Sequence, residues 1–357
     1  MTILYFNLAF VYASSLLARI VGRPNDLKPS FISPNIFFVG IAIACLALIS
    51  GLRNNIGDTY YYMHSYREFD FTWDNIGSSG DFGFNMLQML LQQWTKDPQL
   101  LLITTAVLTN LLIGVTLYKY SRLIELSLYA YITMGYFLVS MNGVRQYLAA
   151  AIIFAATTYL LKGDWKKYML VVLIASTIHQ TALILIPIYF IVRRPAWSKM
   201  TLLMLTFTIL IVWGFNGFME LLFSLIEGTK YAGYRDFQEG GASLIRVIVA
   251  AIPLGLAFLG REKLKELFPQ SDIIVNMALL GVIFMMISTQ NWIFARFSIY
   301  FGLYQLILLP WIVKLFIKKD QKLIYYAIIV CYFLYFFYEH VLSLNINYRS
   351  DYIHLSL

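Results

Sequence analysis

Long apolar stretches alternate with short polar ones along almost the whole chain. The apolar runs are approximately 2–18, 35–50, 99–118, 123–141, 145–161, 168–191, 200–222, 244–260, 273–288, 297–316 and 323–338. About 20 apolar residues in a row can cross the hydrocarbon core of a bilayer as a helix. The pattern therefore predicts an all-α, polytopic membrane protein, with residues 1–357 forming a single integral membrane domain.

Composition supports this class and excludes others. Hydrophobic residues make up 60% of the chain and charged residues 13%, against about 45–50% and about 25% in soluble domains. These values exclude a disordered chain, a nucleic-acid-binding module and an ordinary cytosolic enzyme. An outer-membrane barrel would show short alternating segments. Cys45 and Cys331 both lie in apolar runs, so we expect no disulfide framework and no Cys-rich metal site.

The basic residues give the chain an orientation. Arg19, Arg23 and Lys28 follow the first run, so the positive-inside rule places that loop in the cytoplasm and the N-terminus outside. Alternating the loops from there puts about two thirds of the 27 Lys and Arg on the inner face. The net charge of +8 is thereby explained by topology and not by a binding patch.

The segment 168–191 decides the rest of the topology. It could form one span, but basic clusters flank it on both sides, around Lys166 and around Arg193, and a single crossing would move the later basic loops outside. We therefore predict a hairpin of two short helices with His179 near its tip. Counted as two, it brings the total to about twelve transmembrane or re-entrant helices, with both termini outside. A tip at membrane depth needs protein or a water-filled cavity around it.

Two outer loops are long. Residues 51–98 hold six acidic residues mixed with Tyr and Trp, and 82–94 read as an amphipathic interfacial helix. The second loop spans roughly 223–243 and contains Arg235. The outer aromatic residues can stack on sugar rings or form an interfacial belt.

Four basic side chains are expected on the outer side, although only the inner charges were used to set the topology. They are Arg53, Arg145, His179 and Arg296. Three arginines facing one compartment predict an anion site, because the guanidinium fork suits phosphate. The alternative for each arginine is a helix-end anchor to lipid headgroups. His179 is a candidate general base or a structural histidine in a tight turn.

Further polar residues accompany these four. Asp58 is a second candidate base, a residue that orients an arginine, or a cap of a turn or helix. Candidates for polar support of the site are Asn142, Gln146, Gln290 and Arg235.

Several motifs are absent from the sequence. It has no glycine-rich phosphate loop and no carboxylate pair with metal-ligand spacing in a predicted loop. It also has no soluble nucleotide-binding unit. We therefore expect no cofactor, no metal, no nucleic-acid partner and no nucleotide-sugar donor.

The outward motifs resemble those of a known family. They are Ser50-Gly-Leu-Arg53 with Gly57-Asp58-Thr-Tyr, Asn142-Gly-Val-Arg-Gln-Tyr147, His179-Gln-Thr-Ala182, Ile188-Tyr-Phe-Ile-Val-Arg-Arg194 with Ala196-Trp-Ser198, and Phe294-Ala-Arg-Phe297 followed by Ile299-Tyr-Phe-Gly-Leu-Tyr-Gln305. Each is short, but together and in this order they are similar to the EpsG family of bacterial membrane proteins, which are Wzy-like polysaccharide polymerases. The family often has Gly-x-Asp where Asp58 here directly follows Gly57.

The resemblance implies exopolysaccharide biosynthesis at the bacterial plasma membrane, a role in biofilm matrix formation and a GT-C-like membrane glycosyltransferase fold. It also implies a substrate, an oligosaccharide repeat unit on undecaprenyl diphosphate at the outer face, and pathway partners such as a flippase and a chain-length regulator. In the expected reaction a sugar hydroxyl attacks the anomeric carbon of the donor and undecaprenyl diphosphate leaves. Arg145, Arg296 and then Arg53 would stabilise the diphosphate, with His179 as base.

The residues alone also allow other functions. A flippase of lipid-linked sugars needs a midplane site between repeats, and the chain shows no internal repeat. A non-catalytic scaffold would tolerate replacement of His179. A ligase that hands the glycan to another acceptor differs from a polymerase only through the resemblance.

Overall fold

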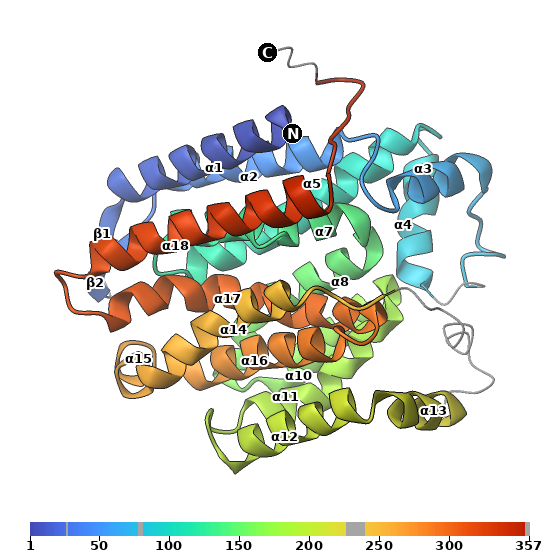
Figure 1. Cartoon of the computed structure of the whole chain (residues 1–357). Helices are drawn as coiled ribbons and strands as arrows, with labels where there is room; N and C mark the ends of the chain where they lie inside the picture. The colour runs from blue at the N-terminus through green and yellow to red at the C-terminus, as the bar shows by residue number, and fades with distance from the viewer. Residues whose placement is uncertain (26–27, 78–80, 226–239, 354–357) are drawn as a thin grey trace. The chain divides into compact units, whose positions relative to one another are not determined.

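The computed structural model describes residues 1–25, 28–77, 81–225 and 240–353. The regular secondary structure of these residues is helical apart from one short antiparallel strand pair. The pair is β1 (Arg23–Asn25) with β2 (Lys28–Ser33), and it follows the first helix (Figure 1). The α-helices up to the centre of the chain are α1 (Thr2–Ile20), α2 (Ile36–Gly51), α3 (Thr59–Glu68), α4 (Phe82–Gln92), α5 (Pro98–Tyr120), α6 (Ile124–Thr133), α7 (Tyr136–Asn142), α8 (Val144–Ala155), α9 (Thr157–Lys162) and α10 (Trp165–Ile178). They are followed by the 3-10 helix η1 (Gln180–Ile184), α11 (Leu185–Val192), α12 (Lys199–Trp213), α13 (Phe215–Leu225), α14 (Leu244–Leu259), α15 (Arg261–Leu267), α16 (Ser271–Ile287), the 3-10 helix η3 (Trp292–Phe294), α17 (Ala295–Leu315), α18 (Gln321–Phe336) and the π-helix η4 (Phe337–Ser343).

The chain divides into two compact units. The first contains Met1–Tyr189 and Leu306–Leu357, and the second contains Phe190–Gln305. Within the first unit α2 packs against α1 and α5, and α8 packs against α5 and α10. Within the second unit α16 packs against α12 and α14.

Capping residues fix where several helices of the first unit begin. The side chain of Asn35 accepts a hydrogen bond from the N–H of Phe37 at 3.0 Å and starts α2. Asp97 accepts one from Gln99 N–H at 3.0 Å, with Pro98 in the first helical position of α5. Both satisfy backbone donors that have no partner inside the helix.

In the part of the chain that the structure describes, four helices are long and apolar enough to cross a membrane, or up to seven if each bent pair is one span. This confirms a polytopic helical membrane protein. The larger number of about twelve and the GT-C-like architecture remain predictions, because several expected runs form shorter helices, such as α2 and α16.

Some runs that read as single spans are broken helices. The run 123–141 becomes α6 and α7, bent by 54° at Gly135, which adopts the left-handed conformation (φ 84°) that favours glycine. The run 200–222 becomes α12 and α13, bent by 95° at Gly214. Hydropathy cannot show such bends, since both halves stay apolar.

The chain turns back within 168–189. The rings of Tyr168 in α10 and Tyr189 in α11 lie 5.2 Å apart between centroids, whereas a straight helix would separate them by about 30 Å. The reversal lies at His179, where α10 ends in an extended conformation and η1 begins.

The first unit has two chemically different ends. At one end, which we call the motif end, the end of α2 meets the start of α5, since Gln99 donates a hydrogen bond to the Gly51 carbonyl. At the other, the basic end, Arg19 Nε lies 2.9 Å from a carboxylate oxygen of the buried Glu125. The helix termini at the basic end also carry Lys119 and Lys162.

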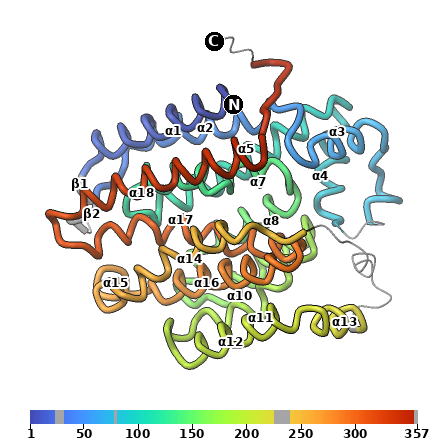
Figure 2. The backbone as a smooth tube through the Cα atoms, in the orientation of Figure 1, coloured from blue at the N-terminus to red at the C-terminus, as the bar shows by residue number. Residues whose placement is uncertain are grey.

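The end of the chain returns to the motif end after η4 (Figure 2). The Tyr348 hydroxyl donates to the Ile49 carbonyl at 2.8 Å, and Asn54 N–H donates to the Arg349 carbonyl at 3.0 Å. The segment 347–351 is therefore held against residues 49–55, which contain the first sequence motif.

Candidate functional site

Asp81 is the meeting point of three separate segments of the first unit. Its Oδ2 lies 2.8 Å from Arg145 Nη1 and 3.5 Å from His179 Nδ1. Its Oδ1 accepts a hydrogen bond of 3.3 Å from the N–H of Gln180. The carboxylate thus joins the start of α4 to the start of α8 and to the turn after α10.

A glycine allows α4 to begin this close to α10. Gly83 lies in the first turn of α4, and a Cβ built on it would lie 2.3 Å from Thr177 Oγ1 near the end of α10. Only a residue without a side chain fits here, so Gly83 sets the approach that brings Asp81 to His179.

The surroundings of Asp81 keep its carboxyl ionised. Asp81 is 4% exposed, and burial by itself raises the pKa of a carboxyl group. The polar contact with His179 and the positive charge of Arg145 outweigh that effect and hold the pKa of Asp81 below its ordinary value. An ionised carboxylate facing Nδ1 orients the imidazole, because the two ring nitrogens lie on different sides of the ring. Nε2 is therefore directed away from Asp81.

Arg145 lies between Asp81 and two aromatic rings. Its Cζ is 5.8 Å from the ring centroid of Tyr62 and 6.0 Å from that of Phe84. Its side chain keeps 38% exposure and contributes to the wall of a cavity of about 570 Å³. Cavities that bind small molecules typically measure about 300–1,000 Å³.

This cavity, the aromatic cleft, has three walls in the first unit. One face of α3 contributes Tyr61, Tyr62 and Ser65, the segment 69–75 forms the outer wall, and α4 contributes Phe84, Asn85 and Gln88. Asp58 and Arg145 complete the lining. Two predicted site residues, Asp58 and Arg145, therefore face the same space.

Arg53 has a different environment from the one predicted. It is 1% exposed, and Nε donates to Thr59 Oγ1 at 2.9 Å while Nη2 donates to the Met141 carbonyl at 2.8 Å. Nη1 donates to the Ser50 carbonyl. Burial lowers the pKa of Arg53 to about 10, so it stays protonated at neutral pH. It ties the ends of α2 and α7 and the start of α3 together and does not reach the aromatic cleft.

A second contact joins the same two motifs. The N–H of Asp58 donates to Asn142 Oδ1 at 2.9 Å. Gly57 has φ 52°, and a Cβ on it would lie 2.0 Å from the same oxygen. Asn142 therefore positions Asp58 through its backbone, and the side chain of Gln146 is buried one turn further along.

The remaining predicted residues are not placed relative to Asp81. Arg296 and Gln290 belong to the second unit, where Arg296 Cζ lies 4.9 Å from the Trp292 ring centroid. Arg235 lies outside the described residues. Among the residues that the structure describes, no group of three or more His, Cys, Asp or Glu could hold a metal ion.

Sequence reasoning did not single out Asp81. It is one of six acidic residues in the loop 51–98, and its position directly before an amphipathic helix indicates only a helix cap. Its partners come from the first turn of α8 and the turn after α10, so only the tertiary structure distinguishes it from its neighbours.

The model of the EpsG family matches residues 36–350. The chain belongs to the EpsG family. Neither the comparison with curated proteins nor that with solved structures finds a match. All three segments that meet at Asp81 lie inside the match to the EpsG family, and so does the part of the C-terminal segment that holds residues 49–55. Membership indicates a membrane protein of exopolysaccharide biosynthesis.

Proposed function

We propose that this EpsG-family protein is a polysaccharide polymerase that joins oligosaccharide repeat units carried on undecaprenyl diphosphate. The observation that supports it most is the carboxylate of Asp81, which contacts both His179 and Arg145, a residue that lines the aromatic cleft. This contact supports the proposal because it joins a candidate base to a candidate anion ligand that lines a cavity.

In the proposed reaction His179 Nε2 takes the proton from a hydroxyl of the acceptor glycan. The hydroxyl oxygen forms a bond to the anomeric carbon of the donor, and the bond from that carbon to the diphosphate oxygen breaks. Undecaprenyl diphosphate leaves with the electron pair. Asp81 stabilises the imidazolium as it forms, as the carboxylate does in a catalytic triad.

Arg145 has the second role in this proposal. Its guanidinium has five N–H donors, of which one contacts Asp81. The others can bind the diphosphate as negative charge develops on the leaving oxygen. Arg296 remains a proposed second ligand of the diphosphate, whereas the buried contacts of Arg53 support a role in holding the helices that carry the site.

The orientation is part of the proposal. The basic end carries Arg19, Lys119 and Lys162, and the positive-inside rule assigns such helix ends to the cytoplasm. The motif end, with Asp81 and His179, then faces the outer leaflet, where flipped lipid-linked repeat units are available. The scaffold and flippase alternatives need neither a base nor its orienting carboxylate.

The test is polymer formation in liposomes that contain purified protein and lipid-linked repeat units. We expect a glycan ladder with the wild type and a rate about 10²–10⁴ lower with His179→Ala, the usual contribution of a general base. Arg145→Lys should lower the rate by about 10²–10³, as for loss of one donor to a developing negative charge.

Matched controls come from the same loop. His64 is an exposed histidine of α3 stacked on Tyr60, and Arg67 is an exposed arginine of the same helix. His64→Ala and Arg67→Lys should leave the ladder unchanged. Full polymer length from folded His179→Ala protein would refute the catalytic role, and unaltered single units moved across the bilayer would support a flippase.

A further inference from the structure

The aromatic cleft combines ring faces with side chains that can accept hydrogen bonds. Tyr61 and Phe69 at its rim are 70% and 63% exposed, while Gln88 at its floor is 4% exposed. Ring faces fit the C–H faces of a pyranose, and amide and carboxylate oxygens accept hydrogen bonds from its hydroxyls. A lipid headgroup interface needs exposed aromatic rings but not a recessed floor of amides.

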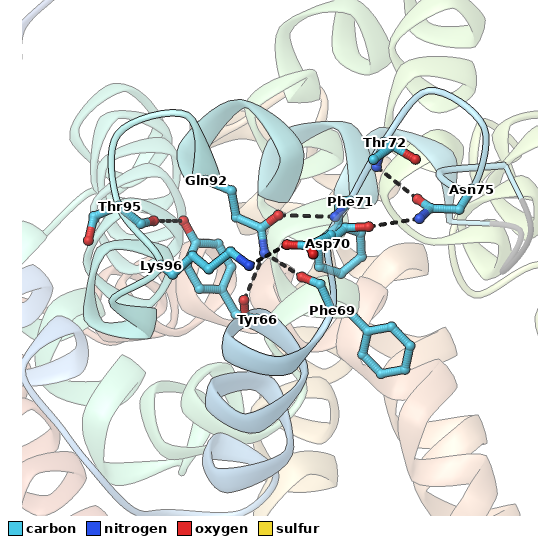
Figure 3. Close-up of polar contacts among 9 residues, drawn as sticks. All are labelled: Tyr66, Phe69, Asp70, Phe71, Thr72, Asn75, Gln92, Thr95 and Lys96. Carbon is cyan, nitrogen blue, oxygen red and sulfur yellow. Dashed lines mark hydrogen bonds and ion pairs between the residues drawn. The ribbon is translucent and has the colours of Figure 1, made fainter.

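One amide holds the outer wall of the cleft in place. Figure 3 shows the Gln92 side chain of α4 between the end of α3 and the segment 69–75. Its Nε2 donates to the carbonyls of Tyr66 and Phe69 at 2.8 and 2.7 Å, and its Oε1 accepts from Phe71 N–H at 3.0 Å. All three bonds go to backbone atoms, so they fix the course of the segment regardless of its side chains.

The segment is closed by a second amide. Asn75 donates to the Asp70 carbonyl at 2.7 Å and accepts from Thr72 N–H at 2.9 Å, as Figure 3 also shows. The outer wall is thus a built turn anchored to α4. Gln92 does not line the cleft and can act on a ligand only through the wall.

The charges around the cleft are acidic in balance. The carboxylates are Asp58 and Asp70 in the lining and Asp81 behind Arg145. The cations are Arg145, already paired with Asp81, and Lys96, which contacts Asp70. Arg145 is the proposed ligand of the diphosphate, so the acidic balance applies to a sugar bound between Asp58 and Asp70. A uronic acid there brings a further carboxylate without hydrogen to donate, and like charges placed side by side are strongly unfavourable.

We propose that the aromatic cleft binds an uncharged sugar residue of the acceptor glycan, that Asp58 and Asp70 exclude acidic sugars, and that Gln92 is the positioning residue of its outer wall. The identification of this sugar as the acceptor rests on the proposed function. The exclusion of acidic sugars and the role of Gln92 do not depend on the proposed function.

The test measures sugar binding without catalysis, by saturation-transfer NMR on purified protein in nanodiscs. The probes are chitotriose, maltotriose and β-1,4-galactotriose as neutral trisaccharides, and trigalacturonate as the acidic one. We expect at least one neutral trisaccharide to bind about tenfold more tightly than trigalacturonate. The double variant Asp58→Asn with Asp70→Asn should remove this preference.

Two variants test the walls of the cleft. Tyr62→Ala and Gln92→Ala should each weaken neutral trisaccharide binding about tenfold. Gln93→Ala, an exposed neighbour, should not. In the polymerase assay Gln92→Ala should raise KM for the repeat unit with kcat nearly unchanged, because the wall contributes no reacting group, whereas general misfolding would lower kcat.

The outcomes separate the two proposals. Neutral binding without any polymer formation would overturn the polymerase and leave the cleft assignment standing. Polymer formation without neutral binding, or equal binding of trigalacturonate, would overturn the cleft assignment. It would also fall if Tyr62→Ala left neutral trisaccharide binding unchanged.

Discussion

At the scale of residues, Asp81 connects charge to folding. Its pKa lies below the ordinary value, whereas in the unfolded chain it returns to about 3.9. Its ion pair with Arg145 therefore stabilises the fold fully above about pH 4, and this contribution is lost as the pH falls through the lower pKa of the folded state.

We therefore expect Asp81→Asn to lower the thermal unfolding midpoint at pH 7 and to flatten its decrease below pH 4. Thermal unfolding in nanodiscs between pH 7 and pH 3 measures both. Asp74, an exposed acid of the same loop, provides the control Asp74→Asn, which should follow the wild-type curve. Identical acid limbs for wild type and Asp81→Asn would contradict this account.

Arg53 leads to a prediction of the opposite kind. Arg53→Lys cannot reach all the acceptors on α2, α3 and α7, and each buried acceptor left without a partner costs about 1–3 kcal/mol. We expect a lower unfolding midpoint, with KM for the lipid-linked substrate unchanged in the folded fraction. A raised KM at unchanged stability would instead return Arg53 to the diphosphate site.

The candidate site could be predicted from the sequence only in part. The inner charges set the topology, and they turned Arg145 and His179 toward the same side. They could not show that Asp81 joins the two, since the approach of α4 to α10 depends on the fit of Gly83 against Thr177. Nor could they distinguish the buried environment of Arg53 from the partly exposed one of Arg145, because both arginines lie at an end of an apolar helix.

At the scale of elements, Gly83 is a sharp test of how α4 is seated. Gly83→Ala places a Cβ 2.3 Å from Thr177 Oγ1, and overpacking of this kind typically costs about 1–3 kcal/mol. We expect a lower unfolding midpoint and reduced polymer formation, because α4 carries Asp81.

The control is another glycine of the same loop. A Cβ on Gly77 meets nothing within 4 Å, so Gly77→Ala should leave both the unfolding midpoint and polymer length unchanged. Equal behaviour of the two variants would show that α4 moves away from α10 without consequence.

The broken helices show which part of the fold hydropathy could not provide. The run 145–161 contains neither Pro nor Gly, yet it divides into α8 and α9 at Ala156. Apolar content places such a segment in the membrane but does not specify where its helix is interrupted. In contrast, the flanking charges of 168–191 indicated the reversal at His179, because each face of the bilayer restricts where basic residues lie.

At the scale of the whole chain, no pattern in the sequence predicts that residues 347–351 return to the first motif. The Tyr348 hydroxyl bond to Ile49 is buried, and we expect Tyr348→Phe to destabilise the protein by about 1–2 kcal/mol. Tyr352→Phe, at an exposed tyrosine, is the matched control in thermal unfolding. An unchanged midpoint for Tyr348→Phe would show that the segment is held by its other contacts alone.

The pairing of the C-terminal segment with residues 49–55 also sets the order in which the molecule is completed during synthesis. The partners are 292 to 299 residues apart in sequence, and a ribosome adds about 5–20 residues per second. About 15–60 s therefore pass between the synthesis of the first motif and that of the C-terminal segment that contacts it. Helices α1 to α10 can insert early, but the end of the molecule that carries the candidate site closes last, so a nascent chain has all the residues of the site before it has their final support.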